Sequence, residues 1–525
     1  MFVTASSTDV RFLQRFTRDD VRRPGPRPKH LVRRPTRPQN PAPSGEKPAT
    51  DVRVHKNGRV VVTETDQAKI VHIAEAMFTQ QCALGRVPRM AGAVSIAGEL
   101  TAFFGNSATP DTLFRIASMT KSFTAAATLL LRDEGLLQLD APVSDYAPEF
   151  SGMVGPTTDA PGLTLRQLLT MSSGLATDDP WGDRHLDISG ADLDSVVVNR
   201  PIFGQHPATA FEYSNLGYGM IGRVIERVSG VTPQSFIATR LLQPLGMTST
   251  VWEAGQAAAG ADVAIGVRVD ALTPERIPLD GGLATMGGIW STARDLAKWV
   301  GFFTDAYPPR DDEETYPLKR SSRREMQTMH TYYEPGSHIS SDGSLIARNG
   351  GYGMGLFIDF DPLLGEVAGH SGGLPGYGSN MRWVKGLPIG IISLGNITYA
   401  PMANTTRRVL DALSAAKLTT RVSLAADPAL ESAGRALMEL LTGWSDQKAG
   451  EIFADNVDPD EPFSERQRNA EALMARHGSL TFARVETSSR ASGRLIAHSP
   501  NAEVVITFSL APLAGGRIQR YDLPA

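Results

Sequence analysis

The chain contains 525 residues, 41% of them hydrophobic and 21% charged, a composition typical of a globular protein with room for two or three domains. Its net charge of −4 is small for this length and gives no support for a general affinity for nucleic acid. The single cysteine excludes an intrachain disulfide framework.

The first 50 residues are rich in arginine and proline and contain few apolar residues, so we expect a disordered basic tail at 1–50. The N-terminus lacks the basic start and apolar centre of a secretory signal. No stretch of the chain approaches the roughly 20 apolar residues of a membrane span. These features predict a cytoplasmic protein without a membrane span.

Residues 51–420 mix helical and strand patterns, without an internal repeat. Helical spacing of apolar residues occurs in four segments: 70–84, 121–140, 163–174 and 215–230. Glycines that commonly end helices stand in or after the last three: Gly135, Gly174 and Gly230. A hairpin is predicted over 92–105, and two strands joined by a tight turn over 381–397. The predicted fold class is α+β, with helices packed on an antiparallel sheet.

The composition changes near residue 425. Residues 429–457 have helical spacing, whereas residues 480–523 read as a run of strands. Helices followed by a strand meander predict a small α+β accessory domain at 425–525.

Ser118 and Lys121 lie one helical turn apart at the predicted start of a helix. Free backbone N–H groups at a helix start favour an oxyanion, and a lysine shielded from water loses its proton more easily. The pair therefore suits an activated nucleophile, although a capping serine followed by a surface lysine gives the same spacing. The spacing also occurs at Ser44/Lys47, Ser414/Lys417 and Ser445/Lys448. The first of these lies in the proline-rich tail, and the other two read as solvated helix surface.

Two further motifs single out Ser118. Only one tyrosine is followed two residues later by asparagine, Tyr213 before Asn215, and only one histidine is followed at that distance by glycine, His370 before Gly372. In this order the three motifs resemble those of the serine β-lactamase and penicillin-binding-protein superfamily. The likeness is closest to its class C-like branch, which includes D-stereospecific peptidases and carboxylesterases, and it covers roughly residues 67–416.

The resemblance implies a β-lactamase/transpeptidase-like sheet flanked by helices, with a helical subdomain. It implies that Ser118 is a nucleophile that forms an acyl-enzyme, and that Lys121 and Tyr213 share its proton. Which of these two is the base stays open. Asn215 would hold a substrate carbonyl, and no metal or cofactor is implied.

The third motif would supply the strand on which the substrate lies. The backbone N–H groups of Ser118 and Gly373 would form the oxyanion hole, and a side chain at Gly372 or Gly373 would obstruct the strand edge. Penicillin-recognising relatives usually place lysine where this chain has His370, and histidine is only partly charged near neutral pH. This difference favours an ester or a D-amino-acid amide or peptide as the small-molecule substrate.

Three alternatives stay open: a β-lactamase or D-Ala-D-Ala carboxypeptidase, a catalytically silent binding or assembly protein, and an α/β-hydrolase. The last depends on residues 369–373, which match the G-x-S-x-G nucleophile elbow and would make Ser371 the nucleophile. Glycines and a proline follow Ser371, where the elbow needs a helix. The substrate itself depends on loops such as 176–195 and 307–336, and the oligomeric state cannot be read from the sequence.

Overall fold

The computed structural model describes residues 53–54, 59–199, 201–333, 336–339, 345–362, 364–419 and 428–524. The predicted tail at 1–50, with Ser44 and Lys47, lies outside these residues. Within them no helix is both long enough and apolar enough to span a membrane.

The core of the fold is one antiparallel sheet. Its nine described strands are β3 (Met90–Ile96), β4 (Glu99–Asn106), β7 (Thr331–Tyr332), β8 (Gly336–Ile339), β9 (Leu345–Tyr352), β10 (Phe357–Asp361), β11 (Gly365–Leu374), β12 (Tyr377–Val384) and β13 (Ile389–Gly395). They lie in the order β4-β3-β13-β12-β11-β10-β9-β7, with β8 paired to β9. The hairpins predicted over 92–105 and 381–397 are confirmed as β3–β4 and β12–β13.

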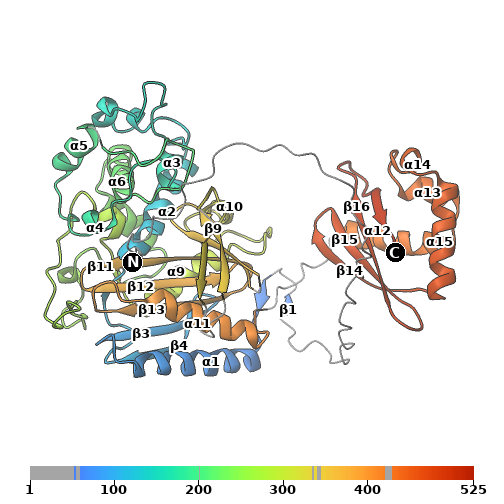
Figure 1. Cartoon of the computed structure of the whole chain (residues 1–525), viewed down its shortest axis with the longest axis horizontal. Coiled ribbons are helices and arrows are strands. Elements are labelled where there is room, and N and C mark those ends of the chain that lie inside the picture. The colour runs from blue at the N-terminus through green and yellow to red at the C-terminus, as the bar shows by residue number, and fades with distance from the viewer. Residues whose placement is uncertain are drawn as a thin grey trace, which may run out of the picture. The chain divides into compact units, whose positions relative to one another are not determined.

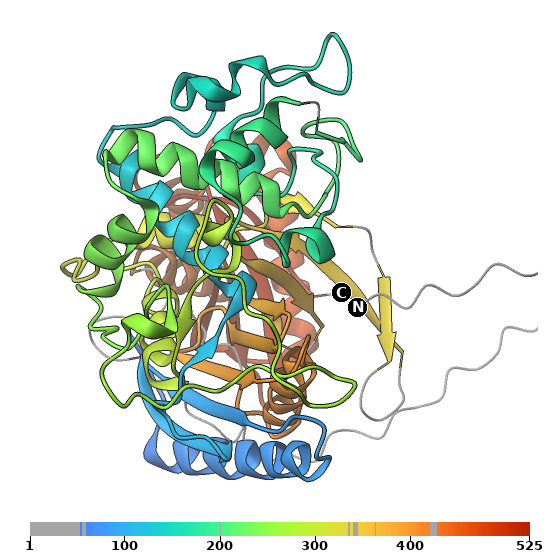
Figure 2. The same cartoon turned by 90° about the vertical axis from the view of Figure 1, so that its left-hand side faces the viewer.

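Helices cover both faces of this sheet (Figure 1). Helices α1 (Glu64–Ala83) and α11 (Met402–Ala415) pack on one face, and α9 (Ala293–Thr304) packs on the other. Strand alternation explains the two layers: in β13 the side chain of Ile391 joins the core under α1 and α11, and that of Ile392 joins the larger core on the opposite side. Figure 2 shows α1, in blue, and the helices of residues 165–242, in cyan to green, on opposite sides of the sheet. The predicted α+β fold is confirmed.

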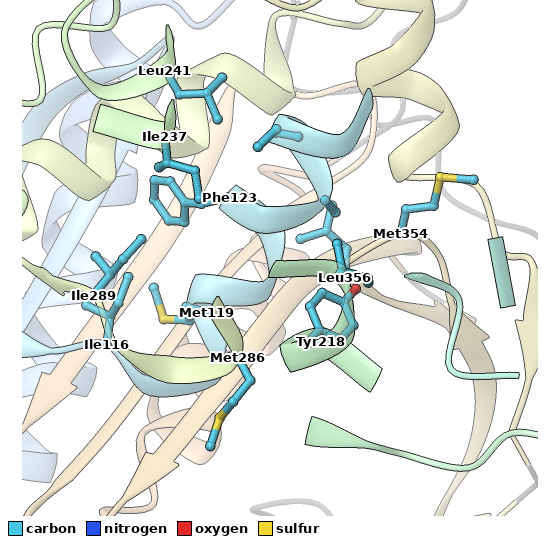
Figure 3. Close-up of a cluster of buried hydrophobic side chains, with 14 of the residues drawn as sticks. Ile116, Met119, Phe123, Tyr218, Ile237, Leu241, Met286, Ile289, Met354 and Leu356 are labelled. Atoms are coloured by element: carbon cyan, nitrogen blue, oxygen red, sulfur yellow. The ribbon is translucent and has the colours of Figure 1, made fainter. Parts of the chain in front are cut away.

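Helix α2 (Thr120–Asp133) runs through the larger core, and its residues are buried from Thr120 to Leu131. A short 3₁₀ turn, η1 (Ala117–Met119), precedes it, so the helix begins two residues later than Ser118. Figure 3 shows Met119 and Phe123 among apolar side chains from several segments, including Ile237 and Ile289. A helix enclosed in this way shields any polar group on it from water.

The other described elements between β4 and β7 are mostly short. They are β5 (Phe114–Arg115), η2 (Val143–Asp145), η3 (Pro148–Gly152), α3 (Leu165–Leu169), α4 (Asp179–Gly182), α5 (Gly190–Val198), α6 (Asn215–Ser229), α7 (Pro233–Ile237), η4 (Ala238–Leu242), η5 (Ala254–Gln256), α8 (Ala284–Gly287), β6 (Trp290–Ser291) and α10 (Arg320–Met326). Gly230 ends α6 in a left-handed conformation, as predicted. The helix predicted over 163–174 is too long, because the chain turns away after Leu169 and Met171 adopts a φ of +56°.

The C-terminal described residues have a core of their own. Helices α12 (Pro428–Thr442), α13 (Asp446–Ile452), α14 (Val457–Asp460) and α15 (Phe463–His477) precede strands β14 (Thr481–Ser489), β15 (Ser492–His498), β16 (Glu503–Leu510) and β17 (Ile518–Asp522). These strands form an antiparallel meander. The Ser445 side chain caps α13 by accepting the N–H of Lys448, an ordinary helix start. The division of the chain near residue 425 stays a prediction.

Candidate active site

Ser118 lies in the 3₁₀ turn that leads into α2, with only 7% of its surface exposed. Ala117, directly before it, has a φ of +51°, a conformation that costs a non-glycine residue energy and that often occurs at functional sites. The turn is held from both sides, because Ile116 donates its N–H to the Ile289 carbonyl and accepts a hydrogen bond from Ser379 Oγ. This fixed turn places Ser118 at the positive end of the α2 dipole.

Lys121 brings the first motif together. Its Nζ lies 2.9 Å from Ser118 Oγ, 2.6 Å from Asn215 Oδ1 and 2.9 Å from the Met286 carbonyl oxygen. The last two oxygens can only accept hydrogen bonds, whereas a serine hydroxyl can also donate. A neutral lysine amine would therefore donate its two hydrogens to these two acceptors and direct its lone pair at the Ser118 hydroxyl.

The environment of Lys121 shifts its protonation equilibrium toward this neutral form. Its complete burial lowers the pKa of the amine from its ordinary 10.5 to about 8, although the nearby carboxylates of Asp179, Asp183 and Asp178 act in the opposite direction. Its three oxygen neighbours include no carboxylate that would hold it as an ammonium ion.

Asn215 connects Lys121 to an acidic loop. Its Oδ1 accepts from Lys121, and its Nδ2 donates to Asp179 Oδ1 at 2.9 Å, so hydrogen bonds orient both ends of the amide. Asp178 accepts the backbone N–H groups of Asn215 and Leu216 at the start of α6. The second N–H of the Asn215 amide can still serve a ligand.

Tyr213 faces the same lysine. The Lys121 Nζ lies 4.9 Å from the centre of its ring, and the tyrosine ring stacks on Phe357. Burial raises the pKa of Tyr213 well above 10, a nearby Asp179 charge adds to this, and a hydrogen bond with the Ser118 side chain opposes it. Tyr213 therefore holds its proton at neutral pH.

Strand β11 runs beside the nucleophile turn. Its neighbour β10 pairs with it only from Gly365 to Gly369, so within the described residues the following stretch has no strand partner on that side. A Cβ at Gly372 would come within 2.3 Å of the Ile116 carbonyl oxygen, which leaves no room for a side chain between the strand and the turn. Ser371 lies inside β11 opposite Asn380 of β12, not before a helix, and the α/β-hydrolase alternative is therefore wrong.

His370 is 2% exposed, and both of its ring nitrogens have partners. Nδ1 faces the Ser371 carbonyl oxygen, which can only accept, so Nδ1 carries the proton, and Nε2 accepts from the Tyr352 hydroxyl at 2.9 Å. Burial, reinforced by Lys121, lowers the pKa of His370 to about 3. The ring is neutral at physiological pH and is positioned by its neighbours.

The structure thus brings Ser118, Lys121, Tyr213 and Asn215 together and places the third motif beside them. Sequence reasoning missed Asp178, Asp179, Tyr352 and the Met286 carbonyl. The first two lie in the loop at 176–195 that was expected to govern the substrate, but nothing in the sequence indicated their bonds to α6. In the described part of the chain, no cluster of three or more histidine, cysteine, aspartate or glutamate side chains is arranged to hold a metal ion.

Comparison with known proteins gives a family match. The model of the family described as beta-lactamase matches residues 74–416, and this match confirms the resemblance drawn from the three motifs. Among curated relatives, beta-lactamase-like protein 4 of Dictyostelium discoideum is 25% identical over 295 residues, 54% of this chain and 50% of the relative. The chain spans about half the length of the curated relatives it matches.

Solved structures agree on the fold. The octameric penicillin-binding protein homologue from Pyrococcus abyssi aligns with a TM-score of 0.54 and 22% identity over 86% of this chain and 95% of its own. A D-stereospecific amidohydrolase from Streptomyces sp. aligns with a TM-score of 0.50 and 23% identity over 64% of this chain and 98% of its own. At these identities the alignments establish a shared β-lactamase/transpeptidase-like fold only. The chemistry has to be inferred from the residues of the site.

Proposed function

Because the chain belongs to the beta-lactamase family, we propose that it is a serine hydrolase that forms an acyl-enzyme at Ser118 and hydrolyses an ester, or an amide of a D-amino acid or peptide. The observation that carries this proposal is the contact between Lys121 Nζ and Ser118 Oγ. The other two neighbours of Nζ, Asn215 Oδ1 and the Met286 carbonyl oxygen, can only accept hydrogen bonds, so the lone pair of a neutral amine points at the serine. The name of the D-stereospecific amidohydrolase, which shares the fold, agrees with the amide substrate.

Acylation begins when neutral Lys121 takes the Ser118 proton as Oγ attacks the substrate carbonyl carbon. The opposite directions of the two pKa shifts favour Lys121 over Tyr213 as the base, since the lysine is pushed toward its neutral form and the tyrosine away from its anion. The carbonyl oxygen becomes an oxyanion, which the N–H groups of Ser118 and Gly373 would stabilise, each such donor being worth on the order of 10²–10³ in rate.

The tetrahedral intermediate collapses when the bond to the leaving group breaks. Protonated Tyr213 is placed to give its proton to the leaving oxygen or nitrogen and to recover one from the Lys121 ammonium. The acyl group then remains on Ser118 Oγ. Water attacks the acyl carbon with proton transfer to the same pair, and the carboxylic acid leaves while Oγ regains its proton.

The neutral state of His370 supports a preference for uncharged substrates. A carboxylate-bearing β-lactam or D-Ala-D-Ala terminus would need a cation on this strand, whereas His370 is uncharged and both its nitrogens are occupied within the protein. We therefore propose that it orients the Tyr213 side of the site and that uncharged esters and amides are preferred over penicillins and cephalosporins.

A turnover assay tests this proposal and the silent-scaffold alternative together. The full chain should hydrolyse p-nitrophenyl butyrate, and Ser118→Ala should remove this activity, with a loss of at least about 10³ in kcat/KM. Ser371→Ala is the matched control, because it removes a neighbouring hydroxyl from β11 and should retain activity. Hydrolysis that survives Ser118→Ala, or that is absent from the parent protein, would contradict the proposal.

A further inference from the structure

The loop from Asp178 to Asp183 packs directly on the site. A Cβ at Gly182 would lie 3.1 Å from Asn215 Cβ, so the loop backbone presses against the asparagine that holds Lys121. The loop carries three carboxylates in six residues, and all three act electrostatically on Lys121. No step of the hydrolysis described above uses them.

The three carboxylates have different surroundings. Asp178 is occupied by the N–H groups at the start of α6, and Asp179 binds the Asn215 amide. Asp183 is 2% exposed: its Oδ2 accepts from the Tyr399 hydroxyl at 2.9 Å, but its Oδ1 is buried and has no hydrogen-bond partner among the described residues. A buried carboxylate oxygen without a donor is costly, so a ligand that supplies a donor there would be stabilised.

Tyr399 connects Asp183 to the strand beside Ser118. A Cβ at Gly373 would lie 2.7 Å from Tyr399 Cδ1, so the tyrosine ring covers the residue proposed to supply the second oxyanion donor. The backbone of Tyr399 has a φ of +52°, an unfavourable conformation for a side chain of this size. The strained residue holds its hydroxyl on Asp183 and its ring against β11.

The charges that act on Asp183 do not neutralise it by contact. Lys121 lies within electrostatic range from α2, but its three hydrogen bonds go to other groups. Arg115 of β5 also interacts electrostatically with Asp183, but it donates its hydrogen bond to the Pro278 carbonyl oxygen. Arg184, the next residue along the loop, pairs with Glu275 at 3.3 Å. Burial and the neighbouring Asp179 charge raise the pKa of Asp183 to about 7, so near neutral pH a cationic donor that reaches Oδ1 would both satisfy this oxygen and keep the carboxylate ionised.

We propose that Asp183, aligned by Tyr399, binds the protonated amine of the substrate's acyl part, so that the preferred substrates are esters, amides or peptides of an amino acid with a free amino group. This inference rests on the proposed function, because it needs Ser118 to be the acylated residue. The acyl side is assigned because Tyr399, which aligns Asp183, also packs on Gly373, the residue proposed to bind the oxygen of the scissile acyl carbonyl. Asp179 adds negative charge and favours the same ligand.

The test compares p-nitroanilides that differ only in charge. Alanyl p-nitroanilide, as both enantiomers, carries the amine, and propionyl p-nitroanilide has the same size without it. The quantity measured is the ratio of kcat/KM for the two substrates at pH 7 in the parent and in Asp183→Asn. Dividing one ratio by the other removes the intrinsic difference in reactivity between the two anilides.

Loss of a charge-assisted hydrogen bond should lower this ratio by roughly 10- to 100-fold in Asp183→Asn. Asp187→Asn is the matched control: it removes the same charge from a carboxylate of the same loop that lies 3.6 Å from Arg276, and it should leave the ratio unchanged. A ratio in Asp183→Asn within about twofold of the parent value would overturn the inference.

A second variant covers the case in which Asp183→Asn does not fold. Tyr399→Phe removes only a hydroxyl from a side chain that is 40% exposed, and it should lower the same ratio by about 3- to 10-fold. An unchanged ratio there would again overturn the inference. Hydrolysis of p-nitrophenyl butyrate by each variant reports on the nucleophile separately, so failure of the amine subsite and failure of the serine hydrolase proposal give different results.

Discussion

Replacing Lys121 with methionine tests the assignment of the base. Methionine fills a similar volume without an amine, so Ser118 loses the group that faces its hydroxyl at 2.9 Å. General-base catalysis contributes on the order of 10²–10⁴ in rate, and we expect kcat/KM for p-nitrophenyl butyrate to fall by that factor.

The pH dependence of kcat/KM in the parent protein tests the same assignment quantitatively. With a pKa of about 8, roughly a tenth of Lys121 is neutral at pH 7, whereas a lysine at its ordinary 10.5 would be neutral in only about one molecule in 3,000. Burial therefore raises the population of the active form by about 300-fold. With the neutral amine as the proposed base, kcat/KM should rise about tenfold per pH unit below pH 7 and level off above pH 8.

The assay follows p-nitrophenol release from pH 5.5 to 9.5. The uncharged ester suits it because Asp183, whose pKa burial raises to about 7, then has no cationic group to bind. Lys385→Met is the control, since that lysine binds the Gln327 carbonyl oxygen and Glu366 and should not alter the profile. A flat profile, a midpoint near pH 10, or a Lys121→Met enzyme within about tenfold of the parent would refute the assignment.

Two further predictions follow from the strand beside Ser118. Gly372→Ala should abolish ester hydrolysis and lower the melting temperature, because its Cβ would lie 2.3 Å from a backbone oxygen of Ile116. Gly373→Ala meets a side-chain ring, that of Tyr399, at 2.7 Å instead of backbone, and it should retain measurable activity. Equal losses in the two variants would contradict this difference. Turnover of a chromogenic cephalosporin should stay low and should not rise from pH 8 to pH 5, because the pKa of His370 is about 3 and the ring stays neutral throughout; a rise toward acid pH would favour a β-lactamase.

Local signals in the sequence were sufficient for much of the fold. The apolar spacing of 215–230 with its terminal glycine predicts α6 and its end at Gly230. The segment at 163–174 carries the same kind of signal, but α3 stops at Leu169 and the chain then forms hydrogen bonds with the segment around Gln205. Gly174 accordingly adopts its positive φ in a loop contact instead of ending a helix.

The candidate site likewise contains contacts that local sequence patterns predict and contacts that they do not. Ser118 and Lys121 are three residues apart, and one turn brings them together, but the same spacing occurs three more times, so the motifs at Tyr213 and His370 were needed to single out this pair. The bond between Asp179 and Asn215 joins residues 36 apart, and the Met286 carbonyl reaches Lys121 across 165 residues. Such contacts depend on packing of the whole fold, and a single sequence carries no local pattern for them.

The identity of the nucleophile is the central claim, and labelling with a fluorophosphonate tests it most directly. The full chain should form one covalent adduct, and mass spectrometry after trypsin digestion should place it on peptide 116–121, which contains Ser118. Prior conversion of Ser118 to alanine should prevent labelling. An adduct on peptide 349–382, which contains Ser371, or no adduct on a folded protein, would contradict the account.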